Sequence, residues 1–337
     1  MMLRRVQMFR WFRGSFLSRG GAVAGLVGLA LLGSALAQAA SPVVLQRPID
    51  LNVPGGQLHG SLLLPQSKAP VPVVLIISGS GPTDRDGNNP EGRNDYLRRL
   101  ALLLAANDIA SVRYDKRGVA SGLPLAPDER MLNVESYVSD AVAWGNQLRQ
   151  DPRFSQLIIL GHSEGALVAS LAAPDAGAAA MISLAGSGRP VDEVLREQLK
   201  ERMPAALLPR SEQIITSLKA GHLDTNVPEP LQLVFRPSVQ PYLISLFRQD
   251  PAKAYAALRM PVLIVQGRND IQVGVKDAQA LQAAQPKAEV ALIGGMNHVL
   301  RIVPMDMKAQ VASYRNPNLP LADALGKRLV TFIQQQQ

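Results

Sequence analysis

Ser163 lies between two glycines in a pattern that can present a nucleophile. In the run LIILGHSEGA, an apolar segment ends at Gly161, and Ser163 and Gly165 follow at two-residue intervals. A serine hydroxyl is a weak nucleophile unless a base takes its proton. A sharp turn from strand to helix exposes the hydroxyl, and its close neighbours must be small because strand and helix approach there. The pattern predicts such a turn with Ser163 at its apex; the alternative is an ordinary Ser-Gly loop.

A base is needed, and the chain offers four histidines. His298 follows an apolar segment in the glycine-rich run GGMNHVLR, near the end of the chain. His162 lies inside the turn, where we expect it to point away from the chemistry of the serine. His59 falls in a predicted hairpin and His222 in a proline-broken region. His298 is therefore the predicted general base.

An orienting carboxylate completes such a site. Asp270 ends the run VLIVQGRND, the apolar segment before the one that leads to His298. Ser163, Asp270 and His298 thus occur in the order Ser–Asp–His, which is that of one large class of serine hydrolases. Asp192 is the alternative acid, but a helical pattern follows it, so we expect it to cap that helix.

Serine hydrolases also need backbone N–H groups that stabilise the oxyanion of the intermediate. Glu164, directly after the nucleophile, is predicted to supply one. The second is expected from SGSGPTDRDGN, which follows the apolar run VVLII, with Ser80 favoured and Gly81 next to it. The alternative for SGSG is a flexible loop.

Two charged runs, TDRDGN and RYDKRG, each follow an apolar segment. Asp84 and Asp86 could be drawn as metal ligands. Nothing else in the sequence requires a metal, so we expect an ion-pair network that fixes the two loops. No cofactor is predicted. The chain has no cysteine, which excludes structural disulfides, thiolate zinc sites and a cysteine nucleophile.

The apolar segments that carry these residues alternate with helical patterns. Such alternation predicts an α/β fold with a mostly parallel central sheet and helices on both faces. Residues of about 190–258 differ, because their helical spacing is interrupted by many prolines. We interpret this segment as a helical cap inserted over one end of the sheet. Ligands bind at the carboxyl ends of the strands in such sheets, where the candidate residues fall.

The first 39 residues are predicted to be a signal peptide, and residues 40–337 to be the folded domain. A leader with five arginines and no acidic residue precedes an apolar stretch, residues 22–37, and the small-residue run ALAQAASP. Cleavage is expected after Ala37 or Ala39, with the product exported to the periplasm or secreted. The stretch is shorter than the ~20 residues of a spanning helix, so a retained anchor is the less favoured alternative.

The net charge of +8 falls to +3 without the five leader arginines. The rest of the chain has no basic cluster with interleaved aromatic residues, so binding to nucleic acid is not expected. A small-molecule ester is the expected partner, and no stable membrane insertion is expected after cleavage. The sequence indicates no oligomeric state.

Taken together, the runs SGSGPTDRDGN, RYDKRG, GHSEG, QGRND and MNH resemble the secreted and cytosolic carboxylesterase branch of the α/β-hydrolase superfamily. The resemblance covers about residue 50 to the end, apart from most of the cap. One departure is Ser78-Gly79, where many relatives carry His-Gly; a backbone donor does not depend on that side chain.

The resemblance implies an α/β-hydrolase fold and hydrolysis of small to medium carboxylic esters through an acyl-enzyme on Ser163. Thioesterase or peptidase activity with the same residues is the alternative among enzymes. A non-catalytic binding protein that kept the fold is the alternative from another class.

Overall fold

One sheet organises the part of the chain that the computed structural model describes, residues 44–337 (for Arg202, the backbone only). Eight strands within this range lie in the order β1-β2-β4-β3-β5-β6-β7-β8. The first two pair antiparallel, β2 also pairs antiparallel with β4, and all later neighbours are parallel. The strands are β1 (Val44–Val53), β2 (Gly56–Pro65), β3 (Val71–Ile77), β4 (Ala110–Tyr114), β5 (Phe154–His162), β6 (Ala180–Leu184), β7 (Val262–Gly267) and β8 (Glu289–Ile293).

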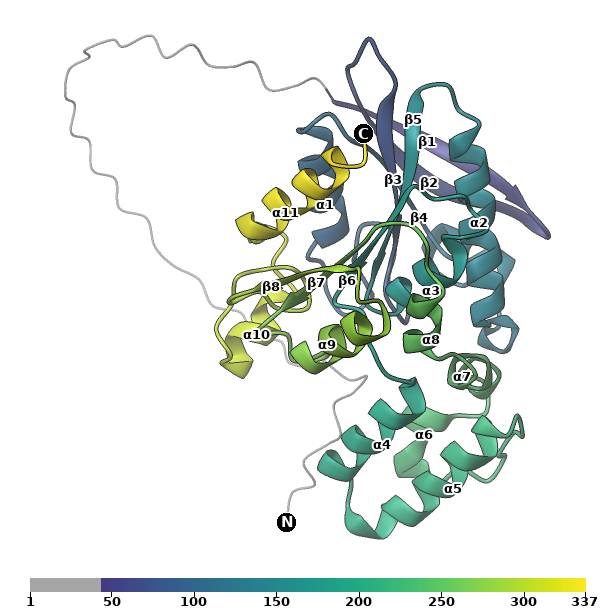
Figure 1. Cartoon of the computed structure of the whole chain (residues 1–337). Helices are drawn as coiled ribbons and strands as arrows, with labels where there is room; N and C mark the ends of the chain where they lie inside the picture. The colour runs from purple at the N-terminus through teal and green to yellow at the C-terminus, as the bar shows by residue number, and fades with distance from the viewer. Residues whose placement is uncertain (1–43) are drawn as a thin grey trace, which may run out of the picture.

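Helices cover both faces of this sheet (Figure 1). Helices α1 and α11 pack on one face, and α2, α3, α8 and α9 on the other. The helices outside the cap are α1 (Tyr96–Ala105), α2 (Val134–Arg149), α3 (Glu164–Ala172), α9 (Val275–Ala284), α10 (Met307–Ser313) and α11 (Asp323–Gln334), with the 3-10 turns η1 (Ala120–Leu125) and η2 (Glu129–Met131). The predicted α/β-hydrolase architecture is confirmed.

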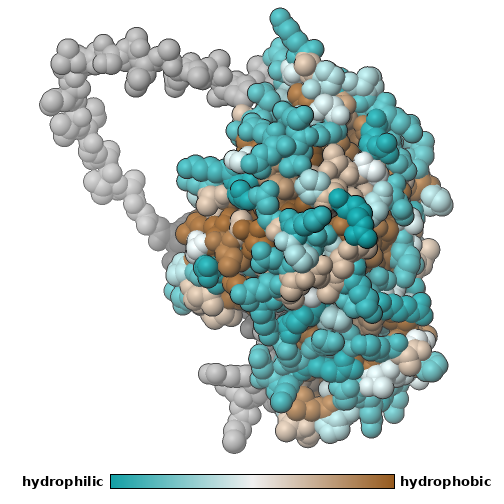
Figure 2. All heavy atoms as spheres, in the orientation of Figure 1, coloured by the Kyte–Doolittle hydropathy of each residue, from teal (hydrophilic) through white to brown (hydrophobic). Residues whose placement is uncertain are grey.

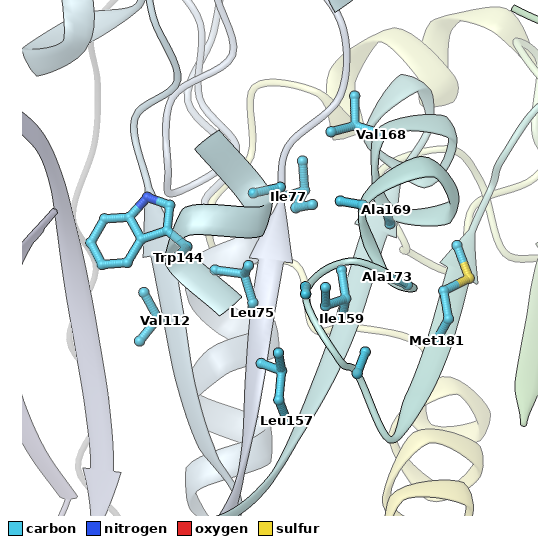
Figure 3. Close-up of a cluster of buried hydrophobic side chains, with 14 of the residues drawn as sticks. Leu75, Ile77, Val112, Trp144, Leu157, Ile159, Val168, Ala169, Ala173 and Met181 are labelled. Atoms are coloured by element: carbon cyan, nitrogen blue, oxygen red, sulfur yellow. The ribbon is translucent and has the colours of Figure 1, made fainter. Parts of the chain in front are cut away.

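The central strands are largely apolar because both of their faces are covered. Every residue of β3 is buried, and successive side chains alternate between the two cores. Leu75 and Ile77 face the core that also contains Trp144 of α2 and Val168 of α3 (Figure 3). The carboxyl ends of β3, β4, β5, β7 and β8 are thereby fixed along one edge, and the candidate residues follow these ends.

The segment between β6 and β7 forms short helices, of which α4 to α7 lie beyond one end of the sheet and α8 packs on its face beside α3 (Figure 1). They are α4 (Val191–Arg202), η3 (Ala205–Leu207), α5 (Leu208–Lys219), η4 (Glu229–Leu231), α6 (Gln232–Phe235), α7 (Gln240–Phe247) and α8 (Pro251–Ala256). Apolar side chains of α4 to α7 form a small core of their own, which includes Leu199, Ile214 and Phe235. The segment is therefore held together by its own packing as well as by contacts with the sheet.

The face of the molecule in Figure 2 is largely hydrophilic, with an apolar area on one side. Large apolar side chains are more than half exposed at Ile302, Met305 and Met307, in the segment that leads from the His298 loop into α10. These exposed apolar residues therefore follow the predicted base, His298, within ten positions of the sequence. The predicted signal peptide, residues 1–39, lies outside the described residues.

Candidate active site

Ser163 has the strained backbone that the glycine pattern predicts. Its φ of 55° and ψ of −123° are unusual for a residue with a side chain, and α3 begins at the next residue. A Cβ on Gly161 would lie 2.0 Å from the carbonyl oxygen of Gly165, and one on Gly165 would lie 2.4 Å from that of Ile77. Strand and helix therefore approach so closely that neither glycine can carry a side chain, and Ser163 at the turn is partly exposed.

Asp270 and His298 are in direct contact. Nδ1 of His298 lies 2.8 Å from Oδ2 of Asp270, and both side chains are almost fully buried. Oδ1 of Asp270 accepts hydrogen bonds from the backbone N–H groups of Gln272, at 2.8 Å, and Val273, at 3.0 Å. Burial acts to raise the pKa of Asp270, but His298 and these hydrogen bonds together lower it below its ordinary value. The carboxylate is thus held in its charged form against the imidazole.

The acid expected as the alternative, Asp192, belongs to the cap. Its carboxylate is fully buried and pairs with Arg196 and Lys219, each at 2.6 Å. The expectation that Asp192 caps a helix is wrong: α4 begins after Pro190, and no side chain caps it. Asp192 instead lies in the first turn of α4, where it accepts hydrogen bonds from two cations.

His162 contributes more than expected. Its Nε2 lies 2.8 Å from the backbone carbonyl oxygen of His298, its Nδ1 lies 2.9 Å from the hydroxyl of Tyr96, and its ring centroid is 4.7 Å from that of His298. A carbonyl can only accept, so Nε2 carries the proton and the tyrosine hydroxyl donates to Nδ1. Burial lowers the pKa of His162 to about 3, which keeps the ring neutral. His162 therefore supports the backbone of the predicted base instead of simply pointing away from the serine.

The loop that carries His298 is closed by two further residues. Backbone N–H of Asn297 donates to the carbonyl of Arg301 at 2.8 Å, and backbone N–H of Arg301 donates to the side-chain oxygen of Asn297 at 3.0 Å. The fully buried guanidinium of Arg301 also reaches the carbonyl of Asn94 at 2.7 Å. The sequence analysis missed both residues, although each lies within three positions of His298.

The predicted oxyanion donors lie on two segments that meet at the nucleophile. An added Cβ on Gly79 would lie 3.1 Å from Cβ of Ser163, so the loop after β3 touches the turn. Within residues 44–337, the backbone N–H groups of Ser80 and Glu164 donate to no protein group. Glu164 is the first residue of α3, where the helix dipole favours negative charge. Gly81 has open space around it and a φ of +67°.

Oγ of Ser163 makes no hydrogen bond to His298 in the described part of the chain. In the absence of substrate, such bonds are often long or misaligned and tighten in the complex. His298 nonetheless lies against the end of β5 that leads into Ser163, because His162, next to Ser163 in the chain, contacts His298 directly.

The two charged runs form the predicted ion-pair network. Arg85 pairs with Asp115 at 2.9 Å, and Arg113 pairs with Asp86 at 2.9 Å. Both pairs join the loop after β3 to β4 and the turn that follows it. Asp84 instead accepts hydrogen bonds from the backbone N–H groups of its own loop. The network fixes the loop that carries Ser80.

Comparison with known proteins gives one family match. The model of the family described as serine aminopeptidase, S33, matches residues 92–301, a range that includes Ser163, Asp270 and His298 but not Ser80. Esterase EstD of Thermotoga maritima is 28% identical over 255 residues, which are 74% of this chain and 59% of EstD. The chain thus spans less than two thirds of the length of that curated relative.

Solved structures share the fold at low sequence identity. Est1E from Butyrivibrio proteoclasticus superposes with a TM-score of 0.55 at 17% identity, over 86% of this chain and 98% of Est1E. The α/β-hydrolase GrgF from Penicillium superposes with a TM-score of 0.56 at 17% identity, over 86% of this chain and 98% of GrgF. An esterase of Pyrococcus furiosus superposes with a TM-score of 0.54 at 14% identity, over 90% of this chain and 96% of the esterase. These similarities show the fold alone.

Proposed function

Because the chain belongs to the serine aminopeptidase S33 family, which has the α/β-hydrolase fold, we propose that it is a serine hydrolase that cleaves carboxylic esters of small to medium size. The observation that carries the proposal is the pairing of His298 with Asp270 at 2.8 Å beside the strained turn at Ser163. The curated relative that is named as an esterase supports the ester as substrate.

In the first half of the proposed reaction, Oγ of Ser163 attacks the carbonyl carbon of the ester, and Nε2 of His298 takes its proton. Asp270 holds Nδ1 of the imidazole and stabilises the imidazolium. The carbonyl oxygen becomes an oxyanion and accepts hydrogen bonds from the backbone N–H groups of Ser80 and Glu164. The bond to the alcohol oxygen then breaks, the alcohol leaves with the proton of His298, and an acyl group remains on Ser163.

In the second half, His298 takes a proton from a water molecule, which attacks the acyl carbon. A second oxyanion forms in the same place, and its collapse breaks the bond to Oγ of Ser163 as the proton returns to the serine. The carboxylic acid is released. The exposed apolar side chains at Ile302, Met305 and Met307 support substrates with an apolar part.

A panel of substrates tests the choice of ester. We expect turnover of p-nitrophenyl esters of graded acyl length, with slower turnover of matched thioesters and of aminoacyl amides. Faster turnover of an aminoacyl amide would instead favour peptidase activity, which the description of the family names. Ser163→Ala should lose turnover on every substrate in the panel while keeping its fold. Substantial turnover by that variant would contradict the proposed nucleophile.

The helical segment between β6 and β7 is proposed to act as a cap that selects substrates, because it starts at the carboxyl end of β6, beside the carboxyl end of β5 that leads into Ser163, and most of it lies beyond one end of the sheet (Figure 1). Export to the periplasm or outside the cell, after removal of residues 1–39, is proposed from the leader pattern. Within residues 44–337, no helix combines the length and apolar character needed to cross a membrane.

A further inference from the structure

Lys116 is a buried lysine whose ammonium group binds the loop beside the nucleophile. It lies two residues after the end of β4, and only 6% of its surface is exposed. Nζ of Lys116 donates a short hydrogen bond to the carbonyl oxygen of Gly79. Gly79 is itself the residue whose backbone lies against Ser163. A positive charge therefore acts directly on the backbone at the start of the oxyanion loop.

The geometry of the peptide bond makes this contact informative. The carbonyl of Gly79 and the N–H of Ser80 belong to the same planar trans peptide unit, so they point in opposite directions. A cation that holds the carbonyl on one side therefore fixes the N–H on the other side. It also polarises the peptide unit, which makes the N–H a stronger donor. The N–H of Ser80 donates to no group within residues 44–337, so it is free to meet an oxyanion.

We propose that Lys116 is a positioning residue that aims and polarises the Ser80 N–H for the oxyanion of the intermediate. The inference rests on the proposed function and adds to it a residue that never touches the substrate. Loss of the ammonium would leave the nucleophile, base and acid intact. It would weaken the site only where negative charge develops, that is, in the transition state and not in the bound ester.

The groups around Lys116 maintain its charge. Carboxylates face it from three elements: Glu164 on α3, Asp115 beside it in the chain, and Asp84 in the loop after β3; His162, on β5, is neutral. Burial lowers the pKa of Lys116 to about 8, although Glu164, Asp115 and Asp84 each act to raise it. The charge is therefore present at neutral pH and is lost as the pH rises through about 8.

Glu164 also connects this arrangement to the cap. Its carboxyl group is hydrogen-bonded to the hydroxyl of Tyr242, on α7, and burial raises its pKa although Lys116 and this hydrogen bond act to lower it. Its backbone N–H is the other proposed oxyanion donor. Lys116 thus lies between the two residues that are proposed to bind the oxyanion, holding Gly79 by a hydrogen bond and interacting with Glu164 through its charge.

Lys116→Met tests the proposal, with Arg117→Met as the matched control. Arg117 is the next residue, and its guanidinium instead pairs with Asp140 at 2.7 Å and donates to the carbonyl of Pro54 at 3.3 Å. Active sites are first counted by titrating a parallel sample with a serine-reactive phosphonate, so that kcat is expressed per titratable site. The measurements are kcat and KM on p-nitrophenyl butyrate and inhibition by phenylboronic acid, which forms a negatively charged tetrahedral adduct with an active-site serine.

For Lys116→Met, we expect kcat to fall by about 10- to 100-fold with little change in KM, since loss of a whole oxyanion donor costs about 10²- to 10³-fold. Inhibition by phenylboronic acid should weaken by a similar factor. Arg117→Met should melt at a lower temperature but keep the wild-type kcat and the wild-type inhibition by phenylboronic acid. The proposal is overturned if Lys116→Met keeps wild-type kcat and boronate affinity, or if Arg117→Met loses both to the same extent.

A pH profile decides the matter if Lys116→Met does not fold. The kcat of the wild type should fall as the pH rises through about 8, the pKa of Lys116. Glu164→Gln removes the carboxylate that most favours the charged lysine, so the fall should move to lower pH. A flat profile from pH 7 to 10, or an unchanged profile in Glu164→Gln, overturns the proposal. A wild type that neither reacts with the phosphonate nor turns over the ester would contradict the proposed function itself, whereas a wild type that does both isolates the role of Lys116.

Discussion

Asp270→Asn is the change for which the structure gives the most specific expectation. The amide can keep its oxygen where Oδ1 accepts from the N–H groups of Gln272 and Val273. Its NH2 then takes the place of Oδ2 and faces Nδ1 of His298, which must accept instead of donate. The proton of the neutral imidazole moves to Nε2, the atom that should receive the proton of Ser163. The variant is therefore expected to hold the base in the wrong tautomer.

The size of the effect can be estimated. In the serine-protease template, the same exchange of acid for amide costs about 10⁴ in turnover. At about 1.36 kcal/mol for each factor of ten, this is about 5 kcal/mol of transition-state stabilisation. Stability should change less, because two of the hydrogen bonds to residue 270 remain. Loss of a hydrogen bond to a charged group costs about 1.5–3 kcal/mol. A fall in melting temperature of several degrees is expected.

The assay compares Asp270→Asn with Asp192→Asn, the other aspartate that could have been the acid. Asp192 pairs only with Arg196 and Lys219 in the cap, both of which are partly exposed. Its variant should lose some stability but keep kcat within a few-fold. The kcat of both variants is measured on p-nitrophenyl butyrate per active site, as counted by phosphonate titration of a parallel sample, and their thermal unfolding is measured alongside. The reasoning is refuted if Asp192→Asn loses turnover by orders of magnitude and Asp270→Asn does not.

Asp270→Asn is also expected to change how the stability of the folded chain depends on pH. The pKa of Asp270 is lower in the folded chain than its ordinary value, so the carboxylate contributes stability above that ordinary value, about 3.9. This contribution is lost as the pH falls through the folded-state pKa. Asp270→Asn should therefore differ most from the wild type in melting temperature near neutral pH, and the difference should shrink below about pH 4.

Three further predictions follow from other parts of the molecule. Gly165→Ala places a Cβ 2.4 Å from the backbone oxygen of Ile77, so both melting temperature and kcat should fall, by about 1–3 kcal/mol in stability; a variant as stable and active as the wild type would contradict the close packing. Leu246→Ala, in the segment proposed as the cap, should change preference for acyl length more than turnover of an acetyl ester, whereas equal loss on all esters would indicate a structural role. N-terminal sequencing of the exported protein should begin within residues 38–41, and an intact Met1 on a membrane-bound product would contradict cleavage.

The fold was predictable because its parallel strands are short, largely apolar runs separated by helical patterns. The run from Val71 to Ile77 is buried on both faces, and its composition indicates as much without any structure. Once the strands are placed, parallel topology requires their carboxyl ends to share one edge. The positions of Ser163, Asp270 and His298 along the chain were therefore enough to predict that they face the same site.

The supporting contacts were not predictable from the sequence, because they depend on where side chains point. Nothing in the run RYDKRG indicates that Lys116 turns inward to Gly79 while Arg117 turns to Asp140. The tautomer of His162 likewise depends on the carbonyl of His298, which is 136 residues away in the chain. Asp192 was misinterpreted because its position early in a helix is typical of a cap, whereas burial beside two cations explains it better.

The central claim is that Ser163 is the nucleophile, and covalent labelling tests it most directly. The wild type would be inactivated by a fluorophosphonate, digested with trypsin and sequenced by mass spectrometry. The account predicts one label per chain, on Ser163 within the peptide that starts at Phe154, with activity lost in proportion to labelling. A label on another residue, or full inactivation without a label on Ser163, would contradict it.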